Sequence, residues 1–174
     1  MKYLFLDIDG VLNHEDWYTS RHNNPGAKPF PYSCFDPACV DRVNEIIEAT
    51  GAHLVISSSW RLSAELWRTL GSVGLKHKFD CTPSWKDMGR VNFDCRGREI
   101  QVYLESRNYN PDTDRFAILD DDVDMLPEQE EQFFQTACDR CTQNIPLIEK
   151  NGGTGLTDDV KNAVEVYLLY GERN

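Results

Sequence analysis

The feature that most constrains this chain is a short apolar run near its N-terminus that ends in two aspartates. Tyr3–Leu6 contains no charged side chain, and it is followed by Asp7, Ile8, Asp9 and Gly10. A continuous run of this kind is typical of a strand covered on both faces, as in a parallel sheet between helices. Asp7 and Asp9 are two positions apart, so their side chains lie on the same side of an extended chain. The sequence therefore predicts two carboxylates at the carboxyl end of a buried strand.

The rest of the chain alternates strand-like runs with amphipathic stretches of helical period. We expect further strands in three segments: His53–Ser57, Phe79–Thr82 and Phe116–Leu119. Helices are predicted from Asp36-Pro37 to Gly51, after Ser63, from about Gly97 to Ser106, and from Thr157 onwards. This alternation predicts the α/β class, with a three-layer, doubly wound parallel sheet and an active site at the carboxyl ends of its strands.

One domain and one interruption are expected. The length of 174 residues fits a single domain over residues 1–174, with no linker or repeat. Residues 13–35 break the alternation, because they are rich in Asn, Pro, Gly and aromatic residues and show no sustained period. We predict that residues 13–35 form a flap or loop, which would be a minimal cap over the site.

Composition and charge argue against several classes of protein. The apolar runs are far shorter than the roughly 20 residues that span a bilayer, and no signal peptide precedes the first strand. We therefore expect no membrane association and a cytoplasmic location. The net charge of −11 argues against stable nonspecific binding to nucleic acid. The six cysteines are expected to be reduced, because the sequence shows no export signal. A zinc site at Cys138-x-x-Cys141 would need two more ligands.

A second acidic group follows the strand expected to end at Leu119. It consists of Asp120, Asp121, Asp122 and Asp124. In a parallel sheet this group can lie beside the first pair of aspartates, and converging carboxylates repel one another strongly unless a cation lies among them. Mg²⁺ prefers a few carboxylates together with water and phosphate oxygens. The pattern predicts a Mg²⁺ site, with a solvated acidic turn as the alternative for Asp122.

Two further segments can hold a phosphoryl group. Ser57-Ser58-Ser59-Trp60-Arg61 follows the second strand, so hydroxyls and free N–H groups emerge at its carboxyl end. A serine-rich helix cap is the alternative interpretation. Arg96 lies at the expected start of a helix, where the helix dipole disfavours a cation unless it serves another purpose. For Arg98 we favour a surface position.

These segments together resemble the motifs of the haloacid dehalogenase (HAD) superfamily. Leu6-Asp7-Ile8-Asp9-Gly10-Val11-Leu12 resembles the first motif, Ser57 or Ser58 the second, Arg96 the third and Asp120-Asp121 the fourth. The chain further resembles the small HAD domains of Swiss Army Knife RNA-repair proteins in four segments: Ser57–Arg61, Arg96–Ile100, Ile118–Met125 and Gly155–Thr157. Ala137 to Gly153, which contains Cys138-x-x-Cys141, departs from the pattern and looks like an insertion.

The resemblance implies a HAD-like Rossmannoid fold and a Mg²⁺-dependent phosphatase that forms an aspartyl phosphate. Asp7 would be the nucleophile and Asp9 the general acid and base. Mg²⁺ would be bound by the Asp7 carboxylate, the Asp9 backbone carbonyl and Asp121, with Asp120 or Asp124 behind them; Asp120 and Asp121 both remain candidates for direct ligand. Contacts to the phosphoryl group would come from Ser57 or Ser58, Gly10 and Arg96, with Arg61 and Asn13 supporting.

The substrate class follows from how little chain is free to cover the site. A cap of residues 13–35 would leave it accessible, which suits a phosphorylated nucleic-acid end or another bulky phosphate ester. The alternatives are a broad small-metabolite phosphatase or nucleotidase, a phosphoacceptor signalling domain, and a HAD-fold binding or regulatory domain without turnover. The order of the motifs disfavours the signalling domain, because such domains place the acidic pair and the acceptor on different strands.

Overall fold

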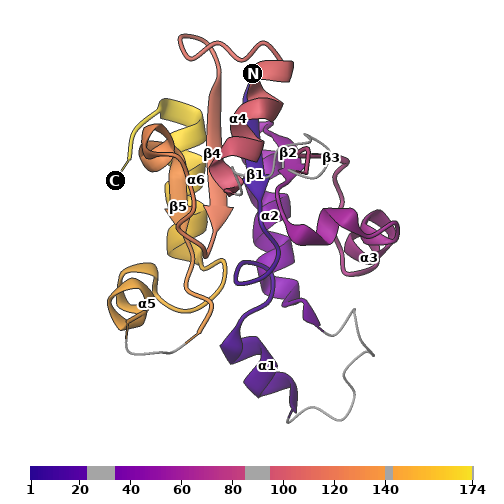
Figure 1. The fold of residues 1–174 in the computed structure, drawn as a ribbon. Coiled ribbons are helices and arrows are strands. Elements are labelled where there is room, and N and C mark those ends of the chain that lie inside the picture. The colour runs from indigo at the N-terminus through magenta and orange to yellow at the C-terminus, as the bar shows by residue number, and fades with distance from the viewer. Residues whose placement is uncertain (23–33, 85–94, 140–142, 174) are drawn as a thin grey trace.

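One parallel sheet forms the centre of the protein in the computed structural model (Figure 1), which describes residues 1–22, 34–84, 95–139 and 143–173. The strands are β1 (Lys2–Leu6), β2 (His53–Ile56), β3 (Phe79–Cys81), β4 (Arg115–Asp120) and β5 (Phe133–Gln135). Their order is β3-β2-β1-β4-β5, and every neighbouring pair is parallel. The chain leaves β1 towards β2 and returns on the other side as β4, so the winding reverses between β1 and β4.

Helices connect these strands and begin and end where the local sequence favours it. They are α1 (Glu15–His22), α2 (Pro37–Thr50), η2 (Ser59–Leu62), α3 (Leu66–Ser72), α4 (Arg96–Ser106), η3 (Pro127–Gln132), α5 (Ile145–Asn151) and α6 (Asp158–Tyr170). The Asp36 carboxylate accepts the Ala38 N–H at the start of α2, and Gly51 ends that helix with a positive φ of 67°. Thr157 caps α6 in the same way by accepting the Val160 N–H.

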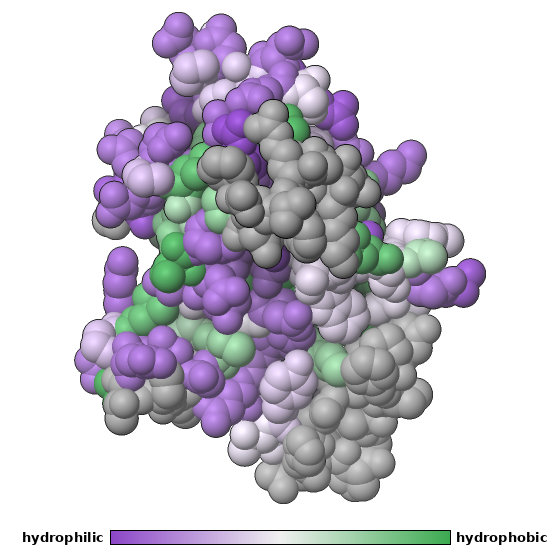
Figure 2. Space-filling view, in the orientation of Figure 1, coloured by the Kyte–Doolittle hydropathy of each residue, from purple (hydrophilic) through white to green (hydrophobic). Residues whose placement is uncertain are grey.

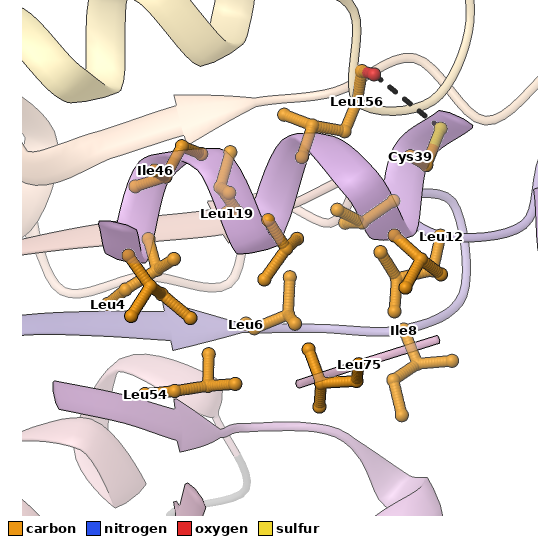
Figure 3. Close-up of a cluster of buried hydrophobic side chains, with 14 of the residues drawn as sticks. Leu4, Leu6, Ile8, Leu12, Cys39, Ile46, Leu54, Leu75, Leu119 and Leu156 are labelled. Atoms are coloured by element: carbon orange, nitrogen blue, oxygen red, sulfur yellow. Dashed lines mark hydrogen bonds between the residues drawn. The ribbon is translucent and has the colours of Figure 1, made fainter. Parts of the chain in front are cut away.

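The sheet separates two layers of helices. Leu4, Leu6 and Ile8 belong to a large apolar cluster that also contains side chains of α2 and α6. Tyr3 and Phe5 belong to a second cluster, with side chains of α4. Figure 3 shows part of the first cluster, where α2, with Cys39 and Ile46, runs alongside β1. Burying each of these Leu or Ile side chains stabilises the folded state by about 1.5–3 kcal/mol. The sheet with a layer of helices on each face confirms the predicted doubly wound, three-layer fold.

The structure differs from the predictions in several places, and η3 and α5 are among the elements that the sequence did not predict. Residues 15–22 of the expected flap form α1, while residues 23–33 lie outside the described residues. Glu15 and Asp16 suit the positive end of a helix, but α1 is too polar for an apolar stripe to reveal it. The short strand β5 was not predicted, since three residues show no period. Ser63 follows the 3₁₀ turn η2 instead of capping a helix, and α3 begins only at Leu66.

The surface agrees with this division between inside and outside. Most of the residues that carry a hydropathy colour in Figure 2 are hydrophilic. Within the described parts of the chain, we find no helix with the length and hydrophobicity that crossing a membrane requires.

Candidate active site

The carboxyl ends of β1, β2 and β4 meet at the point where the winding of the sheet reverses. The Asp7 N–H donates to the Leu119 carbonyl over 2.8 Å, and the Ser57 N–H donates to the Leu6 carbonyl over 2.8 Å. These bonds extend the sheet one residue past β1 and β2 and hold Asp7 beside the end of β4. Open α/β sheets bind their ligands at such a reversal.

Three carboxylates converge there and form what we call the carboxylate cluster: Asp7, Asp120 and Asp121. One oxygen from each lies within 4.8 Å of the others. Asp7 and Asp120 are buried, and Asp120 Oδ2 has no hydrogen-bond partner among the described residues. Gly10 allows Asp121 to come close to the other two carboxylates. The φ of Gly10 is +71°, and a Cβ at this position would lie 2.2 Å from Asp121 Cγ. A residue with a side chain at position 10 would therefore displace Asp121.

The carboxylate cluster resists ionisation. Burial raises the pKa of Asp7 and of Asp120, and the charge of Asp7 raises the pKa of Asp120 further. Burial and the neighbouring Asp122 raise the pKa of Asp121 to about 6. Carboxylate oxygens that are close together, dehydrated and incompletely hydrogen-bonded fit a hard divalent cation. The residues present therefore suit Mg²⁺.

Arg96, the first residue of α4, faces this cluster. Its Nη2 lies 3.6 Å from Asp7 Oδ1, and its Nε lies 3.5 Å from Asp120 Oδ2. The Arg96 N–H donates to Asp124 Oδ2 over 2.9 Å, and the Asp124 carbonyl accepts the Gly97 N–H. Asp124 thus bonds the start of α4, which carries Arg96, and its expected place behind a metal ion stays a prediction.

Asp9 is exposed and has different partners from Asp7. Trp60 Nε1–H donates to Asp9 Oδ2 over 2.9 Å, and Asn13 Nδ2–H donates to Asp9 Oδ1 over 2.7 Å. Asn13 Oδ1 also accepts the Gly10 N–H over 2.9 Å. Two donors therefore fix the Asp9 carboxylate beside the cluster while solvent and substrate can reach it. The Gly10 N–H is therefore bonded to Asn13, and the expected contact of Gly10 with phosphate stays a prediction.

The two serines after β2 are both buried but contact different residues. The Thr82 hydroxyl donates to Ser57 Oγ over 3.4 Å. Although burial raises the pKa of Asp7, a hydrogen bond with the Ser58 side chain opposes that rise. Ser58 is thus the serine in contact with Asp7.

Sequence reasoning missed three residues at this site. Trp60 bonds Asp9, Glu99 pairs with Arg96, and the Cys138 thiol is hydrogen-bonded to Asp121. The three-residue spacing of Arg96 and Glu99 was a usable signal, because such residues are neighbours on a helix. Cys138 carried no signal, since it lies in the segment interpreted as an insertion, whose described part includes α5.

A second polar cluster lies at the start of α2 and consists of His14, Asp36 and Cys39, which we call the histidine cluster. His14 Nε2 lies 3.0 Å from Asp36 Oδ2, and His14 Nδ1 lies 2.8 Å from Thr154 Oγ1. The Cys39 thiol donates to the Leu156 carbonyl over 3.5 Å (Figure 3), so its members bond one another and the loop before α6.

The described cysteines are free thiols: Cys34, Cys39, Cys81, Cys95 and Cys138. Cys141, the second cysteine of Cys138-x-x-Cys141, lies outside the described residues.

Comparison with known proteins gave one match. The family model described as the HAD domain in Swiss Army Knife RNA repair proteins matches residues 3–159. No curated protein and no solved structure matches the chain significantly. The matched span includes every residue of the carboxylate cluster and Arg96.

Proposed function

Since the chain belongs to the family of HAD domains found in Swiss Army Knife RNA repair proteins, we propose that it is a Mg²⁺-dependent phosphatase that forms an aspartyl phosphate. One observation carries this proposal. One carboxylate oxygen from each of Asp7, Asp120 and Asp121 lies within 4.8 Å of the others, with Arg96 facing them, where the winding of the sheet reverses. Converging anions beside a fixed cation suit a phosphate dianion and the metal that accompanies it.

In this proposal the Asp7 and Asp121 carboxylates and the Asp9 backbone carbonyl would hold Mg²⁺, with Asp120 beside them. Bound there, the ion would keep the carboxylates ionised and neutralise the charge of the phosphoryl oxygens. Asp120 would be available to the metal as well, since its Oδ2 is buried without a hydrogen-bond partner among the described residues.

Asp7 and Asp9 carry out the chemistry that we propose. An Asp7 oxygen attacks phosphorus, the bond from phosphorus to the leaving oxygen breaks, and Asp9 gives that oxygen its proton. Asp9 then takes a proton from a water molecule as that water attacks the aspartyl phosphate. Inorganic phosphate leaves and the Asp7 carboxylate is restored. The exposure of Asp9 supports this role, and Trp60 and Asn13 fix its orientation.

Arg96 and Ser58 would bind the transferring phosphoryl group. Arg96 is close to both Asp7 and Asp120, and the Ser58 hydroxyl bonds the nucleophile itself, so both can reach a phosphoryl group on Asp7. Ser57 would support Ser58 from behind, since its hydroxyl is bonded to Thr82. Gly10 would act by leaving room for Asp121.

We propose a phosphorylated nucleic-acid end as the substrate. The family description, which refers to RNA repair proteins, and the small size of the 13–35 segment support this choice. The net charge of −11 weakens this choice, because it argues against binding along a phosphate backbone. A small-metabolite phosphatase or nucleotidase is the alternative.

The test is a substrate panel assayed with Mg²⁺ and with chelator. It compares 3′- and 5′-phosphorylated oligonucleotides with mononucleotides, sugar phosphates and a generic aryl phosphate. We expect turnover to require Mg²⁺ and to be highest with one of the oligonucleotides, because remote contacts supply binding energy. Activity that persists in chelator would refute the metal role, and faster turnover of sugar phosphates would favour the alternative substrate class.

The intermediate is tested with Asp9→Asn. This variant leaves Asp7 free to attack but cannot activate water, so an aspartyl phosphate should accumulate with a good leaving group. Mass spectrometry after a rapid acid quench would show an added phosphoryl group on the peptide containing Asp7. Asp112→Asn, which removes an exposed carboxylate from the loop before β4, is the matched control and should turn over normally without accumulating it. Turnover without any labelled peptide in either protein would contradict the nucleophile assignment.

A further inference from the structure

Glu99 is a buried carboxylate in the first turn of α4, with only 4% of its surface exposed. It contacts two arginines from different segments, Arg61 of η2 and Arg96 of α4. We infer that Glu99 is a positioning residue. It holds the segment with Ser58 and the start of α4 with Arg96 in place around Asp7. This inference rests on the proposed phosphatase function and assigns no contact between Glu99 and substrate.

The first branch runs from Glu99 through Arg61 to Ser58. Arg61 Nη2 donates to Glu99 Oε1 over 2.6 Å, and each of these side chains is 6% exposed. Arg61 Nη1 donates to the Ser58 carbonyl over 2.6 Å. The Ser58 hydroxyl is in turn bonded to Asp7. Through Arg61, Glu99 therefore fixes the backbone that carries the serine next to the nucleophile.

The second branch runs from Glu99 directly to Arg96. Arg96 Nη1 donates to Glu99 Oε2 over 3.2 Å, so the two carboxylate oxygens serve one guanidinium each. The other nitrogens of Arg96 remain at 3.5–3.6 Å from Asp120 and Asp7, which is longer than a direct charge-assisted hydrogen bond. Glu99 thus competes with the nucleophile for Arg96.

Charge explains why a carboxylate is needed at this position. Burial, together with the nearby charge of Arg96, lowers the pKa of Arg61, and the charge of Glu99 opposes both effects. Without Glu99 two guanidinium groups would face each other in a poorly solvated space, where like charges repel strongly. Arg96 would then be drawn onto Asp7 and Asp120, which would occupy the nucleophile and remove the arginine from the phosphoryl oxygens.

The experiment compares Glu99→Gln with Glu105→Gln in the full chain. Both variants remove one carboxylate from α4, but Glu105 is exposed. We measure kcat and KM for an aryl phosphate at saturating Mg²⁺, and the affinity for inorganic phosphate with Mg²⁺ present. Glu99→Gln should lower kcat by roughly 10–100-fold, the scale of a misplaced binding group, and should weaken phosphate binding. Glu105→Gln should change neither.

A double-mutant cycle separates positioning from a general structural role. If Glu99 acts through Arg96, Glu99→Gln should have a much smaller effect on kcat in an Arg96→Ala protein than in the wild type. Equal effects in both backgrounds would overturn the inference. So would a Glu99→Gln protein with wild-type kcat and wild-type affinity for phosphate.

A second variant keeps the inference testable if Glu99→Gln does not fold. Arg61→Gln removes the branch to Ser58 but leaves the Arg96–Glu99 pair, so kcat should fall by a smaller factor, about 10-fold. Wild-type kcat in Arg61→Gln would overturn the inference. A wild-type protein that neither hydrolyses the ester nor binds inorganic phosphate would refute the proposed function itself. By contrast, an active wild type with unaffected Glu99 and Arg61 variants would refute only the role of Glu99.

Discussion

At the carboxyl ends of β1 and β4 burial raises the pKa of Asp7 and Asp120, whereas at the start of α2 the pKa of Asp36 lies below its ordinary value. Burial acts on Asp36 in the same direction as on the others, but hydrogen bonds from His14 and from the Ala38 N–H outweigh it. The Cys39 thiol beside it has its pKa raised to about 12 by burial and by Asp36, so it stays protonated and can donate.

The two clusters differ in how completely their buried polar groups are paired, which separates a structural role from a functional one. The histidine cluster is compensated from within: its members bond one another, a helix N-terminus and the loop at Thr154 and Leu156. It therefore ties the start of the 13–35 segment, at His14, and the residue after its end, Asp36, to the loop before α6. The carboxylate cluster is compensated only in part by Arg96, and buried charge without enough partners is costly. Such a site is stable when a ligand supplies the missing charge, which is typical of a functional centre.

The largest expected effect is on turnover, and it distinguishes replacement of Asp7 in the carboxylate cluster from replacement of Asp36 in the histidine cluster. Asp7→Asn should reduce phosphatase turnover by roughly 10⁴-fold or more, as expected for loss of a nucleophile. The metal-free Asp7→Asn protein should melt no lower than the wild type, because a buried charge has been removed. Asp36→Ala should keep its turnover. Steady-state kinetics and thermal melting of the three proteins check this, and equal loss of turnover in both variants would break the comparison.

The next effect tests the cation that partly compensates the carboxylate cluster. Arg96→Ala should lower kcat by about 10²-fold, the usual effect of losing one preorganised charge at a site of this kind. Arg98→Ala is the matched control, since Arg98 lies two residues away and bonds Gln101 on α4. Kinetics with an aryl phosphate at saturating Mg²⁺ would measure both. Equal losses in the two variants would mean that Arg96 has no special place.

Magnesium should sharpen the comparison through its dependence on pH. In metal-free protein the raised pKa values mean that the folded state binds more protons than the unfolded state. The contribution of these groups to the free energy of unfolding therefore falls as the pH rises above about 4, the ordinary pKa of an aspartate. It continues to fall through about 6, the raised pKa of Asp121, and through the raised pKa values of Asp7 and Asp120. Mg²⁺ at ten times its Kd should add about 1.4 kcal/mol.

The resulting rise in Tm should be larger at pH 8 than at pH 5, because protons compete with the metal for the carboxylates at the lower pH. Differential scanning fluorimetry with and without Mg²⁺ measures this. Asp7→Asn should show a smaller rise, and a rise that is independent of pH would argue against metal binding by these carboxylates.

The smallest effect concerns the histidine cluster alone. Asp36→Ala removes the cap of α2 and the partner of His14, so we expect a loss of about 1 kcal/mol in the free energy of unfolding. Asp41→Ala, an exposed position further along α2, is the control and should cost much less. Urea denaturation would compare them. If Asp36→Ala unfolds like the wild type, the histidine cluster does not contribute to stability as we describe.

Much of this fold could be predicted because its signals are local. The apolar run before Asp7, the Asp36-Pro37 cap and the Thr157 cap each depend on a few consecutive residues, and the structure has a strand or helix at each of them. The helix α1 and the strand β5 were missed, because α1 has no apolar stripe and β5 is too short to show a period. Both are held by contacts made elsewhere in the chain.

The sequence alone determined which residue types lie at the strand ends. Side chains alternate along an extended chain, so Asp7 and Asp9 lie on the same side. The buried apolar strand ends at Leu6 because the charged Asp7 follows it. Only the tertiary structure decided how these groups are joined. It brought Asp120, Asp121 and Ser58 to Asp7. It also bonded Asp124 to the start of α4 and linked Arg61 and Arg96 through Glu99. These pairings depend on the register of β1 against its neighbours and on the reversal beside it, and no short stretch of sequence specifies either.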